Sequence, residues 1–204
     1  MEFNIRGLRI GLTFQTMALM VLALLLFESS NSNGIWVILA IILHEFGHIF
    51  TMSALKSKPQ KILLGNFNVC IIDQKYYQRT FGQDLCILIA GPLANIIAAC
   101  LAYLIYCKFQ QQWLCGIFLS NIFLGIFNLL PVSCLDGGQI FLQFLLLKLS
   151  ENKAKFIAST ISFMILVLLL VLGIMSAFSE IMNFSLLFLS LYLLMVVFIK
   201  KDMH

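Results

Sequence analysis

The stretch "ILAIILHEFGHIFTMSAL", residues 38–55, places two histidines and a glutamate in the middle of an apolar run. An ionisable side chain at the centre of a bilayer costs roughly 2.5–3.5 kcal/mol even on lenient insertion scales. These residues therefore indicate either a segment outside the membrane or a function inside it. The composition of the chain decides between the two alternatives.

The composition is that of a membrane protein. Of the 204 residues, 61% are hydrophobic and only 11% are charged, whereas soluble domains carry about 25% charged residues. The net charge of +4 would suggest nucleic acid in a soluble protein, but here membrane topology explains it better, and no nucleic-acid partner is expected. The six cysteines form no CxxC pair and no secreted disulfide pattern, so most are expected to be small buried side chains.

Apolar runs predict about six transmembrane helices, since one span needs about 20 mostly apolar residues. The expected spans are residues 12–27, 35–55, 84–107, 113–149, 156–177 and 184–199. The fourth is overlong, and "NLLPVSCLDGG", residues 128–138, interrupts it with a proline and two glycines. Residues 61–73 are too short to span and favour a short membrane-associated β-hairpin or strand. We therefore expect an all-α polytopic membrane fold that forms a single domain over residues 1–204.

The basic residues predict the orientation of these spans. With a cytoplasmic N-terminus and six crossings, the positive-inside rule holds for all 13 Lys and Arg residues except Lys108. Both termini of this multi-pass protein of the cell membrane are then cytoplasmic. The same orientation places His44 and His48 in the cytoplasmic half of their helix, at a depth similar to the interruption of the fourth segment.

His44, Glu45 and His48 form an HExxH motif. Residues four apart share one face of a helix, so both imidazoles can reach one ion. This is the arrangement of zinc metallopeptidases, in which the glutamate is the general base. The bare pattern is weak, but each ionisable residue in a membrane helix needs a reason. The alternative is a pair of histidines satisfied by hydrogen bonds between helices.

Zinc needs a third protein ligand and an open position for water. Asp136 is the first candidate, because it is the only other carboxylate expected well inside a span and at a matching depth. Asp84 opens the third helix, where the helix dipole favours a carboxylate, so it needs no catalytic role. Cys134 lies close to Asp136 in the sequence and is the second candidate.

Three ordered motifs resemble those of the site-2 protease family of intramembrane zinc metalloproteases. After HEFGH, "GPLAN" at residues 91–95 resembles the family's GPxxN stretch. "NLLP" at residues 128–131, followed by Asp136-Gly137, matches its NxxPxxxxDG pattern. The six-span layout is similar to the sporulation-type branch, with a catalytic core at about residues 35–149 and flanking helices around it. The chain would be a minimal form without a PDZ or CBS domain.

The resemblance implies one zinc ion held by His44, His48 and Asp136, with Glu45 activating water and returning the proton to the leaving amine. It also implies a substrate site. Asn128 would hydrogen-bond the substrate backbone or the oxyanion, and its alternative is to cap the broken helix. Asn95 would contact substrate or, alternatively, bridge helices. Pro131, grouped with them, is expected to shape the break.

The implied function is an intramembrane endopeptidase that cuts a transmembrane or membrane-associated segment on the cytoplasmic side, in regulated intramembrane proteolysis or peptide maturation. Its partners would be a membrane protein or peptide substrate and the lipid bilayer, and the sequence identifies no regulatory partner. The alternative is a non-hydrolytic protein, either a metal transporter or an inactive protease that binds clients. The protease is favoured because the outer halves of the spans carry almost no polar residues and because Glu45 is present.

Overall fold

The computed structural model describes residues 2–5, 8–12, 33–55, 61–65, 68–72, 79–178 and 185–202. The chain divides into two compact units, Met1–Leu129 and Leu130–His204, while the single domain expected over residues 1–204 stays a prediction. The first expected span, residues 12–27, lies outside the described residues apart from Leu12, which ends a strand.

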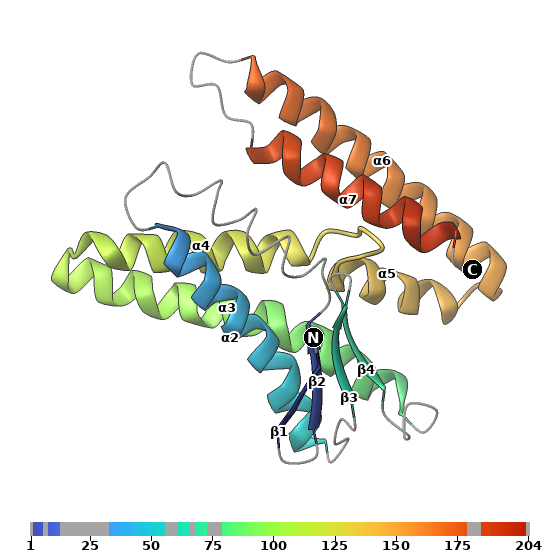
Figure 1. Ribbon diagram of the computed structural model, residues 1–204, viewed down its shortest axis with the longest axis horizontal. Coiled ribbons are helices and arrows are strands. Elements are labelled where there is room, and N and C mark those ends of the chain that lie inside the picture. The colour runs from blue at the N-terminus through green and yellow to red at the C-terminus, as the bar shows by residue number, and fades with distance from the viewer. Residues whose placement is uncertain are drawn as a thin grey trace. The chain divides into compact units, whose positions relative to one another are not determined.

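Three helices that pack against one another build most of the first unit (Figure 1). They are α2 (Asn33–Ala54), α3 (Phe81–Phe109) and α4 (Gln112–Asn128). A capping box between Thr80 and Gln83 starts α3, because the two side chains satisfy backbone N–H groups that a helix start leaves without partners. Gln110, in the left-handed region at φ 51°, ends α3 and turns the chain into α4.

Small residues let these helices approach closely. A Cβ on Gly47 of α2 would lie 2.6 Å from the carbonyl oxygen of Ala90 on α3. A Cβ on Gly125 of α4 would lie 3.2 Å from the carbonyl oxygen of Pro92 on α3. Glycine at both positions therefore allows backbone contact between helices, as small residues commonly do in membrane proteins.

The first unit also contains a four-stranded sheet in the order β1-β2-β3-β4. Its strands are β1 (Glu2–Ile5), β2 (Leu8–Leu12), β3 (Lys61–Gly65) and β4 (Asn68–Ile72). β2 and β3 are parallel, whereas β1 with β2 and β3 with β4 are antiparallel. β3 and β4 occupy the segment where a hairpin or strand is expected, and its association with a membrane stays a prediction. Among the described strands, β1 and β4 are the two edge strands of this sheet.

The second unit consists of α5 (Asp136–Leu146), α6 (Glu151–Ala177) and α7 (Ser185–Asp202). α6 packs against both α5 and α7. At Gly173 the contact with α7 is close, since a Cβ there would lie 2.7 Å from the Cα of Leu187. The expected segment 113–149 is thus two helices, with α4 ending at Asn128 and α5 beginning at Asp136. Pro131 lies in the break, where its missing N–H and fixed φ disfavour a continuous helix.

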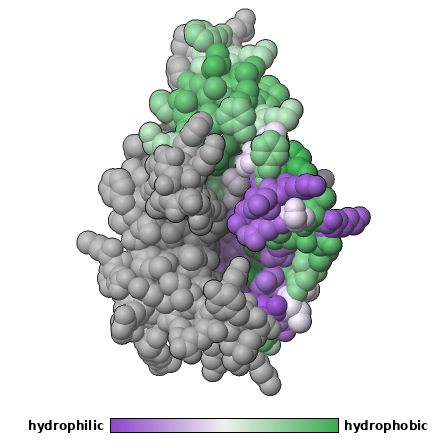
Figure 2. Space-filling model, turned by 90° about the vertical axis from the view of Figure 1, so that its right-hand side faces the viewer, coloured by the Kyte–Doolittle hydropathy of each residue, from purple (hydrophilic) through white to green (hydrophobic). Residues whose placement is uncertain are grey.

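Three described helices are long and apolar enough to cross a bilayer: Gly34–Ala54, Phe81–Phe109 and Glu151–Ala177. The apolar helices Gln112–Asn128 and Leu186–Val197 are shorter, and the six-span topology stays a prediction. Figure 2 shows hydrophilic side chains gathered in a patch beside hydrophobic surface on the side where α5 and α6 meet. At that connection the charged residues are exposed, namely Lys148, Glu151, Lys153 and Lys155. A charged connection fits the end of a membrane helix at water.

Candidate metal centre

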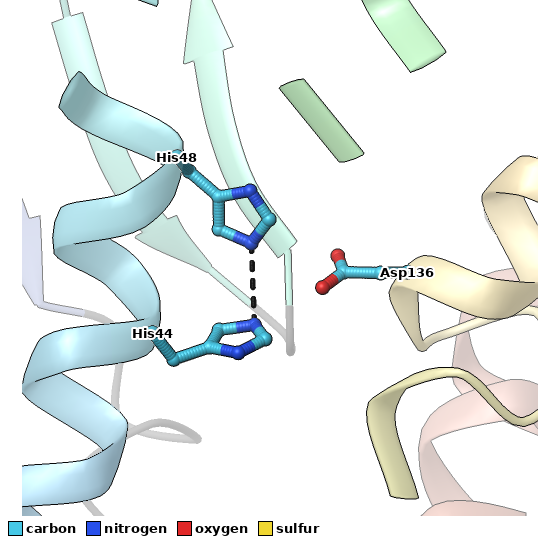
Figure 3. A group of neighbouring side chains, drawn as sticks. All are labelled: His44, His48 and Asp136. Atoms are coloured by element: carbon cyan, nitrogen blue, oxygen red, sulfur yellow. Dashed lines mark hydrogen bonds between the residues drawn. The ribbon is translucent and has the colours of Figure 1, made fainter. Parts of the chain in front are cut away.

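His44 and His48 lie one turn apart on the same side of α2 (Figure 3). Both side chains are buried, each with 6% of its surface exposed. Their rings are 4.8 Å apart between centroids and nearly perpendicular, and their Nε2 atoms are 3.2 Å apart. The i, i+4 spacing of the helix therefore brings the two ring nitrogens together as expected for a shared ion.

The Nδ1 atom of each imidazole forms a hydrogen bond with a residue of α3. His48 Nδ1 lies 2.7 Å from the carbonyl oxygen of Ile87. A carbonyl oxygen only accepts, so Nδ1 of His48 carries the proton and donates it. His44 Nδ1 lies 2.7 Å from Oδ1 of Asn95, which also only accepts. Both histidines are thereby held as the tautomer in which Nε2 carries a lone pair.

The amide orientation of Asn95 follows from its other contacts. Its Nδ2 donates to the carbonyl oxygen of Ala40 at 2.9 Å and to Oδ1 of Asn121 at 2.8 Å. These two bonds use both amide hydrogens, so the oxygen is the atom that faces His44. Asn95 has no exposed surface. Asn95 thus connects α3 with α2 and α4, and its role toward a substrate stays a prediction.

The histidine pair fits a zinc ion. Two nitrogens about 2.0–2.1 Å from zinc at a tetrahedral angle lie about 3.3–3.4 Å apart, close to the 3.2 Å between the Nε2 atoms. With both Nδ1 protons donated outward, neither Nε2 of the neutral rings can donate to the other. Two Nε2 lone pairs that face each other at 3.2 Å suit two ligands of one cation, so the donor arrangement fits a bound metal.

Gly91 of α3 makes room for the two rings. A Cβ at this position would lie 2.3 Å from Nε2 of His48 and 2.8 Å from Cε1 of His44. The rings thus rest against the backbone of α3 at a point where any side chain would overlap them. This explains in physical terms why the "GPLAN" stretch begins with glycine.

Glu45 follows His44 directly on α2 and is half-buried. A carboxylate beside a metal-bound water is the general base of HExxH enzymes. Its position in the sequence next to a buried histidine therefore places an acid–base group at the same turn of α2 as the candidate ligands.

Asp136 belongs to the second unit, where it is the first residue of α5 (Figure 3). It is buried, with 8% of its surface exposed, and the start of a helix favours a carboxylate. The break before it is tied to α6, because Ser162 Oγ accepts from the backbone N–H of Ser133 at 2.9 Å. Gly138 tightens the same turn, since a Cβ there would lie 2.0 Å from the carbonyl oxygen of Val132.

Two imidazoles of the first unit, His44 and His48, and one carboxylate of the second unit, Asp136, are buried. Cys134, the second candidate for the third ligand, is also buried and belongs to the second unit. Two imidazoles and one carboxylate are a donor set that zinc accepts.

The remaining candidate residues lie at the end of α4 and in the break. Asn128 is half-buried, and its Nδ2 donates to the carbonyl oxygen of Leu124, one turn back in α4, at 3.1 Å. Pro131 is half-buried between α4 and α5. Their roles toward a substrate stay predictions. Asn121 lies outside the three motifs, and its only signal in the sequence is an amide in the middle of a largely apolar helix.

Two buried imidazoles with converging Nε2 atoms, on a helix long and apolar enough to cross a membrane, are typical of a metal centre in a membrane protein. The model of peptidase family M50 matches residues 107–169. A protein of Methanocaldococcus jannaschii named as a zinc metalloprotease is 29% identical over 202 residues, and the alignment covers 93% of this chain and 57% of that relative. The chain thus spans little more than half of this curated relative's length.

The solved structure of a site-2 protease from Methanocaldococcus jannaschii is similar to the whole chain. The TM-score is 0.71 at 27% identity, with 97% of this chain and 93% of that chain covered. This chain is thus similar to peptidase family M50 over residues 107–169 and to a site-2 protease over nearly its whole length.

Proposed function

We propose that this protein is an intramembrane zinc-dependent endopeptidase that cuts a transmembrane or membrane-associated segment of another protein. The observation that carries the proposal is the histidine pair of α2, whose Nε2 lone pairs converge at 3.2 Å while α3 holds both Nδ1 protons. An HExxH helix with its glutamate intact has the parts of a metallopeptidase. The relatives named as a zinc metalloprotease and a site-2 protease support the same chemistry.

The proposed zinc ligands are His44, His48 and Asp136. Asp136 is supported by its burial and by its place in the DG motif. Three protein ligands leave a fourth position open for water, as in catalytic rather than structural zinc sites. The Ser162 bond to the break before α5 would hold the carboxylate in place.

When bound, zinc would lower the pKa of a water molecule and polarise the peptide carbonyl that is attacked. Glu45 takes the proton from the attacking water and later delivers it to the nitrogen of the leaving segment. Asn128, at the end of α4, is assigned a hydrogen bond to the substrate backbone, and Pro131 keeps the neighbouring chain open. Asn95 is assigned to His44 instead of to the substrate, because its amide groups bond to α2 and α4.

The cut is assigned to the cytoplasmic half of the bilayer. The proposed topology has both termini in the cytoplasm, which leaves Lys108 as the only basic residue outside among 13. The exposed charges at the start of α6, including Glu151 and Lys155 paired at 2.6 Å, fit a cytoplasmic connection. α2 would then run inward, with His44 and His48 in its inner half.

A substrate helix must unwind before cleavage, because its peptide groups are hidden in hydrogen bonds. The freed groups need new partners where water is scarce. We assign this task to β4, whose second edge borders no other described strand. An extended substrate segment would add to the sheet there by β-augmentation.

Photo-crosslinking tests the role of β4. A photoreactive side chain introduced at successive positions of Asn68–Ile72 is expected to crosslink a cleavable single-span protein close to its cut site. The same probe in β1, at the opposite edge of the sheet, is the control and is expected to give no such product. Crosslinks from β1 alone, with an active enzyme, would contradict the assignment.

The proposed function is tested by reconstituting the protein with a panel of single-span test proteins and comparing wild type with Asp136→Asn. The wild type is expected to bind one zinc ion per chain and to cut in the cytoplasmic half of the span. The variant loses an anionic ligand, so zinc affinity should fall about 100-fold, and cleavage should fall with it. Zinc content is measured by metal analysis and cut sites by mass spectrometry of the fragments.

Each alternative gives a different result in the same liposomes. A metal transporter would move zinc to a dye trapped inside without cutting any test protein. An inactive client-binding protein would retain test proteins intact at full zinc occupancy. Cleavage that persists after complete zinc removal would refute the mechanism, and wild-type zinc affinity in Asp136→Asn would refute the third ligand.

A further inference from the structure

We propose that Asn121 on α4 determines which nitrogen of His44 is available to the metal, acting through Asn95. The inference rests on the proposed zinc centre and adds to it a positioning residue that lies outside the three family motifs. Asn121 is buried, with 4% of its surface exposed, in a helix whose other buried residues are Leu114 and Gly125. A buried amide in such a helix requires hydrogen-bond partners.

Three hydrogen bonds form a chain that runs in one direction from His44 into α4. His44 Nδ1 donates to Asn95 Oδ1 at 2.7 Å, and Asn95 Nδ2 donates to Asn121 Oδ1 at 2.8 Å. Asn121 Nδ2 donates to the carbonyl oxygen of Ile117 at 2.9 Å. The chain ends on a backbone oxygen, which can only accept, so the direction of every bond is fixed. Hydrogen bonds aligned in this way also strengthen one another.

The alternative orientation of Asn95 would inactivate His44 as a ligand. If its amide turned over, Nδ2 would face His44 and Oδ1 would face two acceptors, the Ala40 carbonyl and Asn121 Oδ1. His44 Nδ1 would then have to accept, which moves the ring proton to Nε2. A protonated Nε2 of a neutral ring has no lone pair for a metal. Asn121 and Ala40 together prevent this state, and Asn121 is the partner that a substitution can remove.

The experiment compares Asn121→Leu with Asn121→Asp. Leucine has a similar size but no acceptor, so the turned-over amide of Asn95 becomes accessible, and zinc affinity is expected to fall about tenfold. Aspartate keeps an acceptor for Asn95 and is expected to retain affinity within about twofold. Zinc affinity is measured by competition with a chelator. The His44 tautomer is measured separately in zinc-free protein from ¹⁵N chemical shifts of the labelled imidazoles.

The decisive comparison repeats Asn121→Leu in a protein that already carries Asn95→Asp. A carboxylate accepts from His44 Nδ1 in either orientation, so Asn121→Leu is expected to cause no further loss of zinc affinity there. This non-additivity is the signature of two residues acting in one chain. Thr51→Val is the matched control, because the Thr51 hydroxyl donates to the carbonyl oxygen of Gly47 within its own helix at 3.0 Å. It should leave zinc affinity and the His44 tautomer unchanged.

The outcomes separate this inference from the proposed function. If wild type binds no zinc, the zinc centre is wrong, and the tautomer measurement still tests Asn121. If wild type binds zinc but Asn121→Leu leaves tautomer and affinity unchanged, Asn121 has no positioning role. An equal loss in the Asn95→Asp background would also overturn the proposal, since it would indicate a general packing effect. Asn121→Ala takes the place of Asn121→Leu if the latter does not fold.

Discussion

Replacing Glu45 by glutamine is expected to lower the rate of peptide cleavage about 10³-fold or more while zinc stays bound. Glutamine has nearly the same size but cannot take a proton from the attacking water or return it to the leaving nitrogen. The hydrogen bonds that anchor His44 and His48 come from Ile87 and Asn95, so the ligands keep their positions. The single-turnover cleavage rate and the zinc content per chain are measured together.

Glu151→Gln is the matched control for this change. Glu151 is exposed at the start of α6 and pairs with Lys155 one turn away, so its loss should leave the cleavage rate unchanged. An exposed pair of this kind is worth little to stability. Equal cleavage by Glu45→Gln and wild type would mean that another group moves the proton, and loss of zinc from Glu45→Gln would mean that Glu45 has a structural role.

Gly91→Ala is expected to reduce zinc affinity at least about 100-fold, the effect of displacing a ligand rather than weakening its support. The added methyl would lie 2.3 Å from Nε2 of His48 and 2.8 Å from Cε1 of His44. Neither ring can retreat without breaking its Nδ1 bond to Ile87 or Asn95. Either the metal-binding nitrogens move or α2 separates from α3. Zinc competition and thermal unfolding distinguish the two responses.

Gly82→Ala, on the same helix, is the control. A Cβ at Gly82 would meet no atom within 4 Å, so zinc affinity should stay at the wild-type value. Stability should rise slightly, by about 0.4–1 kcal/mol, because alanine restricts the unfolded chain more than glycine. Wild-type zinc affinity in Gly91→Ala would show that the rings do not rest against α3 as described.

The part of the site that depends on local geometry could be predicted from the sequence. The spacing of His44 and His48 fixes their common face, because the helix period relates residues four apart. Pro131 likewise predicted an interruption within residues 128–138, and the break lies between Asn128 and Asp136, whereas the two glycines belong to α5. Both inferences use only the chain near each residue. The mainly helical architecture follows for the same reason, since long apolar runs admit few other structures.

The supporting contacts could not be predicted because they depend on packing between distant segments. Asn95 and Asn121 are 26 residues apart and meet only when α3 and α4 pack together. Ile87 contributes a backbone carbonyl, which every residue has, so no residue type signals its role. The strands β1 and β2 were not expected either, because β2 pairs with β3, a segment far away along the chain in which Lys61 lies opposite Arg9.

The two histidines differ in whether a substitution can remove the acceptor of their Nδ1 proton. The proton of His48 is held by a main-chain carbonyl at Ile87, which no substitution of that side chain removes. The proton of His44 is held by a side-chain amide at Asn95, which a single codon change replaces. Substitutions at Asn95 can therefore change the metal affinity through His44. The hydrogen bond that orients His48 stays the same when the side chain of Ile87 is replaced.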